Sequence, residues 1–415
     1  MVYRSALKSR HCSKLRALYI IGKPEYKEYI FQPLRMTILF FARLFYPHIG
    51  GVEKHVLEIG KRLVKKGHRV IVITEQLDNI SVRIKPTDSI EGISIHRIPV
   101  GKNGWFKKFR IWSWLWNNRK LMHTADVVHC HDVFFWYLPF KFLYPRKKVF
   151  TTFHGYEGNN LPSRKAILMH KIAEVVSDGN ICIGDYLKKW YGTKPTYVSY
   201  GAIEIPSPKI IKKKASSNKH AFVFIGRLEE ETGMLTYLKT MTLLKNKRIP
   251  FSLQVLGDGS QRNICEQYSK KHKLNIEFRG FVPDVYKFIH QADYVLTSRF
   301  LGTMEAFVMK KFVFAVYNNE IKKDCFAMAP YRNYLVLVKN ETALAKKIIY
   351  CLQHKKIVSE KITNAYDWVK KHTWDSLTDL YLRLWLKSSQ NSSWISSDNR
   401  VSKNVLSYHR SSADN

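Results

Sequence analysis

Residues 45–74 read FYPHIGGVEKHVLEIGKRLVKKGHRVIVIT, and this stretch contains the pattern that decides the fold. Gly50 and Gly51 open a segment of helical periodicity, and Gly67 ends it before a β-branched run. The periodic apolar residues are Val52, Val56, Ile59 and Leu63. This order predicts a helix that packs on a parallel sheet. Glycines before the first turn also let backbone amides approach an anion such as phosphate. The competing interpretation is that the two glycines only form a tight turn.

Strand candidates alternate with helical segments along most of the chain. The first series is 38–41, 70–73, 94–98, 127–129, 149–153, 180–183 and 196–198, and the second is 221–225, 252–256, 276–278, 294–296 and 312–316. Such alternation predicts two doubly wound α/β domains, each with a parallel sheet covered on both faces. Ligands of this architecture bind at the carboxyl ends of the strands, so we expect a cleft between the domains.

The same patterns suggest six regions along the chain. We expect an N-terminal extension outside the fold (1–35, with Met36 as an alternative start), a first domain (36–206), a basic linker (207–219), a second domain (220–372), a C-terminal helix packing back toward the first domain (373–387) and a disordered tail (388–415). The C-terminal helix, Trp374 to Leu386, carries Leu377, Leu380, Tyr381 and Leu384 on one face. The first residues are basic like a signal peptide, but their apolar stretch is too short for one.

Charge and cysteine content restrict the functional class. The chain has 69 Lys and Arg against 33 Asp and Glu, a net charge of +36. This excess is spread along the chain, which favours an anionic substrate or an anionic membrane surface over nucleic acid. Six cysteines without CxxC spacing indicate reduced thiols. Since no apolar run reaches the roughly 20 residues of a membrane span, we expect a cytoplasmic protein, peripheral on the inner membrane face at most.

The second domain contains residues suited to a phosphorylated ligand. Arg227 follows its first strand, where a guanidinium can bind phosphate in a bidentate manner. A glycine turn, LGDG at 256–259, ends the next strand. Glu305 is expected at the start of a helix, where the alternative role is to stabilise the helix dipole by about 0.3–1 kcal/mol. The acidic run Glu229 to Glu231 is expected to be a solvated loop.

Taken together, these segments resemble the retaining glycosyltransferases of GT-B fold, specifically family four, also described as glycosyl transferases group one. The resemblance covers Met36 to Leu386. Its segments, in the order of the family, are FYPHIGGVEKH (45–55), ADVVHCHD (125–132), TTFHGYEG (151–158), IGRLEEETG (225–233), LGDG (256–259), RGFV (279–282) and SRFLGTMEA (298–306). The dinucleotide fingerprint GxGxxG is absent, which counts against a dehydrogenase.

The resemblance implies transfer of a sugar from a nucleotide diphosphate-sugar to a glycan or lipid-linked acceptor, with retention of configuration, in cell-envelope polysaccharide or glycolipid synthesis. It implies that His154 contacts the transferred sugar, Arg227 neutralises the diphosphate and Glu305 binds the ribose. The implied donor-binding set is Gly50, Gly51, Gly226, Arg227, Thr232, Gly257, Arg299, Gly302, Thr303 and Glu305. The implied acceptor-side set is Glu53, His131 and Glu157. The family needs no metal, and no other cofactor is expected.

Two departures from the family pattern motivate a competing hypothesis. The family carries a lysine five residues after the arginine, where this chain has Thr232. It also carries a second glutamate eight residues before Glu305, where this chain has Thr297 in a shortened segment. Arg299 and the amides near Gly302 are candidates to substitute. The alternative is a catalytically silent GT-B protein that binds a glycan or a partner protein.

Histidines raise the question of a metal site. His129 and His131 alternate on one strand, so both face the same side and could bind a metal together with His154. No cysteine or carboxylate cluster completes such a site, so we expect no bound metal. A nucleic-acid binder is a further competitor, but it is suggested by charge alone and would show a steep salt dependence.

The segment Lys102 to Lys120 is basic and rich in tryptophan. Trp105, Phe109, Trp112 and Trp116 recur at helical spacing among basic residues. This composition is typical of an interfacial membrane helix, in which each basic residue near an anionic surface adds about 1 kcal/mol. The competing interpretation is an aromatic stripe that faces the core.

Overall fold

The structure, a computed structural model, describes residues 35–48, 50–76, 85–101, 104, 106–155, 161–206 and 219–387. The described residues belong to one compact unit that begins at Arg35. The expectations for the N-terminal extension, most of the linker and the C-terminal tail therefore lie outside the described residues, as do those for Trp105 and Glu157.

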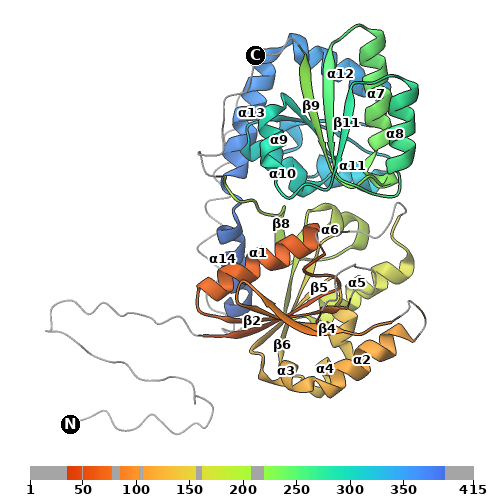
Figure 1. Cartoon of the computed structure of the whole chain (residues 1–415). Coiled ribbons are helices and arrows are strands. Elements are labelled where there is room, and N and C mark those ends of the chain that lie inside the picture. Colours follow the sequence, from red (N-terminus) through yellow and green to blue (C-terminus); the bar gives the residue numbers. More distant parts are fainter. Residues whose placement is uncertain are drawn as a thin grey trace, which may run out of the picture. The chain divides into compact units, whose positions relative to one another are not determined.

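The first sheet has eight strands and is parallel except at one edge (Figure 1). Its spatial order is β3 (Thr87–Ile90), β4 (Ile93–Ile98), β2 (Arg69–Glu75), β1 (Thr37–Ala42), β5 (Val127–His131), β6 (Lys148–Phe153), β7 (Gly179–Ile183) and β8 (Tyr197–Ser199). Its helices are α1 (Gly51–Lys65), α2 (Lys107–Asn117), α3 (Arg119–Thr124), α4 (Phe134–Leu143), α5 (Arg164–Val176) and α6 (Tyr186–Tyr191). Strand β3 alone runs antiparallel to its neighbour.

The second sheet has six strands, all parallel. Its order is β11 (Ile276–Gly280), β10 (Phe251–Leu256), β9 (His220–Ile225), β12 (Tyr294–Leu296), β13 (Phe312–Val316) and β14 (Val336–Val338), the doubly wound order of a nucleotide-binding sheet. Its helices are α7 (Met234–Asn246), α8 (Arg262–Lys271), α9 (Tyr286–Gln291), α10 (Phe300–Val308), α11 (Glu320–Ala327), α12 (Glu341–Gln353) and α13 (Lys355–Val369), with short 3-10 helices at Glu230–Thr232 (η2) and Arg332–Tyr334 (η3).

The central strands are apolar on both faces because helices cover both faces. In β1, Ile38 and Phe40 belong to one buried cluster, whereas Leu39 and Phe41 belong to another. The first cluster includes the buried stripe of α1, and the second includes Ile111 and Leu115 of α2. A strand whose alternate residues are all buried cannot lie at a solvated face.

The last helix, α14 (Trp374–Lys387), packs against α1 and β7 of the first sheet. Leu377, Tyr381 and Leu384 are buried there, and Trp374 and Trp385 are buried with them. The chain therefore returns to the first sheet after it has completed the second.

The predicted two-sheet α/β fold is confirmed, and each of the twelve predicted strands is present. The prediction missed β3 and β14. Strand β3 is a short polar edge strand, TDSI, and β14 has only three residues, so neither has a strong periodic signal. Within the described residues, no helix combines the length and the apolar composition that a membrane span requires.

Candidate functional site

The glycine-rich loop before α1 is shaped by Glu53. Gly50 is the N-cap residue, and a Cβ there would lie 2.3 Å from a Glu53 carboxylate oxygen. The other Glu53 oxygen lies 3.0 Å from Nδ1 of His48. A Cβ on Gly51 would meet no atom within 4 Å. Gly50 thus packs beneath the end of the flexible Glu53 side chain, whereas Gly51 faces open space at the first turn of the helix.

His131 and His154 form a pair at the carboxyl ends of neighbouring strands. Nδ1 of His131, the last residue of β5, lies 2.9 Å from Nε2 of His154, directly after β6. The backbone N–H of His154 donates to Oδ1 of Asp132 at 2.8 Å. Burial lowers the pKa of both imidazoles well below the ordinary value, so both rings are neutral at neutral pH.

A chain of hydrogen bonds ties α14 to this pair of strands. The indole N–H of Trp385 can only donate, so Nδ1 of His129 accepts it at 3.0 Å. His129 is neutral because burial lowers its pKa, and its Nε2–H donates to the Thr152 hydroxyl at 2.8 Å. The Thr152 hydroxyl lies 2.7 Å from the Tyr381 hydroxyl, which in turn lies 2.8 Å from Nε2 of His55. These contacts connect α14 with β5, β6 and α1.

Arg227 and Arg299 converge on one carboxylate. Their Nη2 atoms lie 3.0 Å and 2.6 Å from the same oxygen of Glu231. The prediction of a solvated loop is wrong for Glu229 and Glu231, because residues 230–232 form the 3-10 helix η2 and Glu229 accepts hydrogen bonds from the backbone and hydroxyl of Ser260. Glu231 is held by the two arginines, whereas Glu230 is exposed as predicted.

Lys322 of α11 adds a third cation near Arg227 and Arg299. Its side chain is only 5% exposed. Burial and the two guanidinium groups lower the pKa of Lys322 to about 8, although the Glu231 carboxylate opposes this shift. With these three cations and the carboxylates of Glu229 and Glu231, the local charge is positive when Lys322 is protonated. Such a site favours an anion of high charge.

The threonines of the predicted site hold the backbone of its loops. The buried Thr232 hydroxyl lies 2.7 Å from the carbonyl oxygen of Arg227 and 2.6 Å from that of Glu229. The Thr303 hydroxyl donates to the carbonyl oxygen of Arg299 at 2.8 Å. Both side chains therefore position the segments that carry the arginines.

The glycines after the strands are set by close packing. A Cβ on Gly257 would lie 1.9 Å from the carbonyl oxygen of Gly226, which forces a glycine where the two loops meet. A Cβ on Gly302 would lie 2.6 Å from Oγ1 of Thr297, the residue at the position of the family's missing glutamate. Thr297 is buried and donates to the carbonyl oxygen of Ile225. The shortened segment thus packs α10 directly onto the end of the strand.

Glu305 is buried and forms an ion pair with Lys54 of α1. The Lys54 ammonium lies 3.0 Å from a Glu305 oxygen. Glu305 is the sixth residue of α10, so the expectation that it starts a helix is wrong, and the helix dipole is not its partner. Burial raises the pKa of Glu305 above its ordinary value, although Lys54 opposes the shift.

Helix α2 exposes two of its four aromatic residues. Phe109 is 55% exposed and Trp116 is 50% exposed, whereas Ile111 and Leu115 face the core. Trp112 is partly buried and donates its indole N–H to the carbonyl oxygen of Phe135. The interpretation of a core-facing stripe is therefore wrong for Phe109 and Trp116.

The sequence predictions missed three residues that the structure brings into the site. Lys54, His55 and Lys322 reach it through tertiary contacts with residues far away in the sequence. The available signal was that Lys54 and His55 lie in the first turns of α1, beside the glycine pair. For Lys322, the sequence pattern of α11 gave no indication that the side chain lies in the site.

Comparison with known proteins agrees with this architecture. A family described as Glycosyltransferase Family 4 matches residues 49–196, and one described as Glycosyl transferases group 1 matches residues 219–354. The GPI3 subunit of phosphatidylinositol N-acetylglucosaminyltransferase from Saccharomyces cerevisiae is 24% identical over 277 residues, covering 60% of this chain and 59% of its own length. The chain thus spans about six-tenths of that relative.

Two further relatives are covered almost completely. The glycosyltransferase MJ1178 of Methanocaldococcus jannaschii is 23% identical over 352 residues, which cover 80% of this chain and 93% of that protein. The crystal structure of a glycosyltransferase from Rickettsia africae aligns with a TM-score of 0.66 at 18% identity, over 86% of this chain and 100% of that one. The chain belongs to the GT-B glycosyltransferases of the family 4 and group 1 type.

Proposed function

We propose that this protein transfers a sugar from a nucleotide diphosphate-sugar to a glycan or lipid-linked acceptor, with retention of configuration and without a metal cofactor. The observation that carries the proposal is the cationic group around Glu231. Arg227, Arg299 and protonated Lys322 contribute three positive charges and Glu229 and Glu231 two negative charges, which leaves one positive charge. A departing diphosphate develops negative charge on its oxygens, so cations held in place there stabilise the transition state.

Lys322 can replace the family lysine that is missing at the position of Thr232. The ammonium that the family carries at the position of Thr232 is missing from the sequence, but α11 supplies another beside the same two arginines. The charge needed at the leaving group is therefore present, and this favours an enzyme over a silent binding protein.

The remaining residues receive roles that their contacts allow. His154 faces the transferred sugar; its neutral ring is held by His131, and the Asp132 carboxylate accepts from its backbone N–H. Glu305 accepts hydrogen bonds from the ribose of the donor, with Lys54 neutralising its buried charge. Front-face attack by the acceptor hydroxyl explains retention in this family, so no protein nucleophile is required.

A lipid-linked acceptor at the cytoplasmic face of a membrane fits the first-sheet helices. The yeast relative is a subunit of a phosphatidylinositol N-acetylglucosaminyltransferase. In this chain, Phe109 and Trp116 of α2 are exposed, and so are Phe142 and Leu143 at the end of the neighbouring helix α4. Exposed aromatic residues beside lysines and arginines suit the interface of an anionic membrane.

Nucleotide binding and turnover test the proposal together. The full chain is screened by thermal unfolding against nucleoside diphosphates and their sugars, then assayed for sugar transfer and donor hydrolysis. A ligand at 100 times its dissociation constant stabilises the native state by about 2.7 kcal/mol. We expect a stabilising nucleotide, with turnover that is lost in Arg227→Gln and Glu305→Gln.

A matched control separates site charge from total charge. Arg279 of β11 pairs with Glu277 at the sheet edge, so Arg279→Gln removes one positive charge away from the cationic group. Its turnover is expected to match that of the unmodified protein. Nucleotide binding without turnover would support the silent alternative, and the absence of any stabilising nucleotide would overturn the proposed enzyme.

A further inference from the structure

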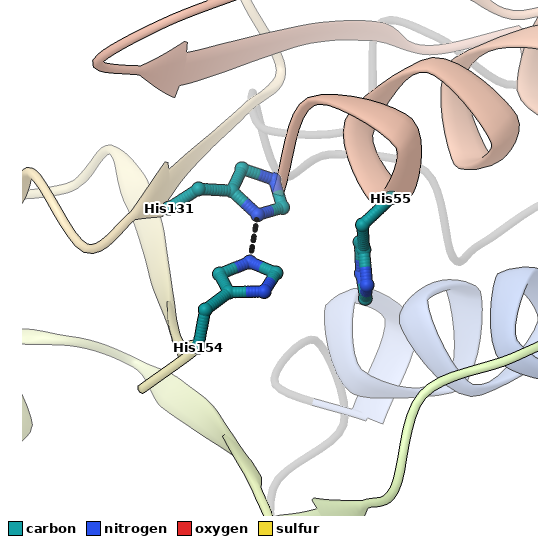
Figure 2. A group of neighbouring side chains, drawn as sticks. All are labelled: His55, His131 and His154. Carbon is teal, nitrogen blue, oxygen red and sulfur yellow. Dashed lines mark hydrogen bonds between the residues drawn. The ribbon is translucent and has the colours of Figure 1, made fainter. Parts of the chain in front are cut away.

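Three imidazoles from different elements face one another in the first-sheet region. His55 lies in α1, His131 ends β5 and His154 follows β6. One ring nitrogen from each lies within 4.8 Å of the other two. Figure 2 shows His131 and His154 joined by their hydrogen bond, with His55 approaching from the helix. The His55 ring stands perpendicular to that of His154, with the two centroids 4.6 Å apart.

These three imidazoles are in the neutral form, which is the form that binds metal ions. Burial lowers the pKa of His55 to about 3 and holds the pKa values of His131 and His154 well below the ordinary value. Their lone pairs therefore carry no proton at neutral pH, and neutral imidazole is the ligand form.

One nitrogen of the cluster is buried without a partner. Among the described residues, Nε2 of His131 has no hydrogen-bond partner. Only one hydrogen lies between His131 and His154. If His131 donates it, Nε2 of His131 is a buried lone pair, and if His154 donates it, Nε2 of His131 is a buried N–H. Either arrangement leaves a buried polar atom unsatisfied, and coordination through Nδ1 of His131 would leave its Nε2 as the N–H.

The distances are close to those of a coordination sphere. Zinc binds histidine nitrogens at about 2.0–2.1 Å, which places tetrahedral ligands about 3.3 Å apart. His131 and His154 lie at 2.9 Å, so a few tenths of an ångström separate them from this geometry, and His55 must move closer. Coordination at Nε2 of His55 would replace its hydrogen bond with Tyr381. The Asp132 carboxylate, which accepts from the backbone of His154, offsets the charge of a cation.

We propose that His55, His131 and His154 bind one divalent transition-metal ion of the zinc type, and that this ion inhibits sugar transfer. The site differs from the one considered from the sequence, because Trp385 and Thr152 occupy both nitrogens of His129 and His55 takes its place. The inhibitory consequence rests on the proposed function: a ring that coordinates an ion cannot also face the transferred sugar, so the ion competes with the donor.

Metal binding is tested without any substrate. The full chain is freed of metal with a chelator and titrated with Co²⁺ by visible absorption, and then with Zn²⁺ in competition. We expect one tetrahedral Co²⁺ per chain, with affinity at least tenfold lower in His55→Asn and His154→Asn. The matched control is His170→Asn, because His170 is also a shielded histidine, stacked between Phe153 and Tyr191, and should bind as the unmodified protein does.

A second measurement needs no variant. Electron paramagnetic resonance of the protein with one equivalent of Cu²⁺ is expected to show coupling to three nitrogens. The proposal is overturned if Co²⁺ gives no saturable tetrahedral spectrum, if the copper spectrum lacks nitrogen coupling, or if folded His55→Asn and His154→Asn retain full affinity.

The inhibitory consequence has its own readout. Zn²⁺ should raise the apparent KM for the donor, a chelator should reverse this, and His55→Asn should lose the effect. Co²⁺ binding in a protein that transfers no sugar would keep the metal site and overturn the proposed function. Sugar transfer with no metal binding would keep the function and overturn the site.

Discussion

The ammonium nitrogen of Lys54 lies 3.0 Å from a carboxylate oxygen of Glu305, and this contact joins α1 of the first sheet to α10 of the second. Glu305 is only 4% exposed, so its charge depends on this partner. A single lysine therefore opposes the effect of burial on the pKa of the proposed ribose ligand.

Replacing Lys54 should destabilise the native state through Glu305. In Lys54→Met, we expect a loss of about 1–3 kcal/mol at pH 7, because a buried carboxylate loses its partner. Burial already raises the pKa of Glu305, so the native state holds this proton to a higher pH than the unfolded chain. The free energy of unfolding therefore falls as pH rises through the native pKa, and removal of Lys54 moves that pKa upward.

Urea unfolding at pH 5 and pH 7 measures this effect. The variant should recover stability at pH 5, and Lys54→Met/Glu305→Gln should recover it at both values. Lys61→Met is the control on the same helix, because its pair with Glu58 is a partly exposed i,i+3 contact of small value. Equal losses in the two lysine variants would contradict the role given to Glu305.

Lys322 should set the pH dependence of diphosphate binding. We expect Lys322→Met to weaken the binding of a nucleoside diphosphate by at least tenfold, since one charge-assisted contact is lost. The pKa of Lys322 is about 8 before binding, and an anion raises it. Binding therefore takes up a proton, so the affinity of the unmodified protein should fall as pH rises above about 8.

Isothermal titration calorimetry between pH 7 and 9 checks both statements. Because Lys322→Met lacks this titrating group, its affinity for the diphosphate should change less between pH 7 and 9. The neighbouring residue provides the control: Lys323 pairs with Glu320 on the exposed side of α11, and Lys323→Met should behave as the unmodified protein does. A similar decline with pH in Lys322→Met would show that another group titrates.

Thr232 should act through the loop and not through a direct contact with the donor. Thr232→Val keeps the shape but removes the hydroxyl that lies near the carbonyl oxygens of Arg227 and Glu229. We expect a loss of about 1–2 kcal/mol in the free energy of unfolding. Diphosphate affinity should fall with it, because Arg227 loses its support. Thermal and urea unfolding measure the first effect and calorimetry the second.

A helical threonine provides the comparison for this change. The Thr242 hydroxyl donates to the carbonyl oxygen of Leu238 within α7, remote from the arginines. Thr242→Val should leave diphosphate affinity unchanged. If Thr232→Val lowers stability but leaves affinity intact, the loop does not position Arg227.

The exposed aromatics of α2 should govern membrane binding. Phe109→Ser/Trp116→Ser is expected to bind phosphatidylglycerol vesicles at least tenfold more weakly, while folding normally, because both side chains lie at the surface. Cosedimentation with vesicles measures this, and phosphatidylcholine vesicles should bind less well than anionic ones. Phe281→Ser changes an aromatic that is 59% exposed after β11 and should have no effect. Unchanged vesicle binding of the double variant would contradict the proposed binding of α2 to a membrane.

Local patterning of the chain was sufficient for the two parallel sheets. The apolar runs that became β1, β2, β9 and β13 are buried on both faces, and glycine and proline punctuate them, so each strand could be located without its neighbours. The short strands β3 and β14 could not be located, because their pairing comes from the adjacent strand and not from their own composition.

The residues of the proposed site also fall into those that the sequence could predict and those that it could not. Arg227, Glu305 and His154 could be named from segments that lie next to strand ends, since a parallel sheet brings those ends to one edge. The partners that decide their charge could not: 251 positions separate Lys54 from Glu305, and 326 separate His55 from Tyr381. Sequence periodicity reports which face of an element is buried, whereas pairing across such separations depends on how the elements pack, and only the tertiary structure contains that information.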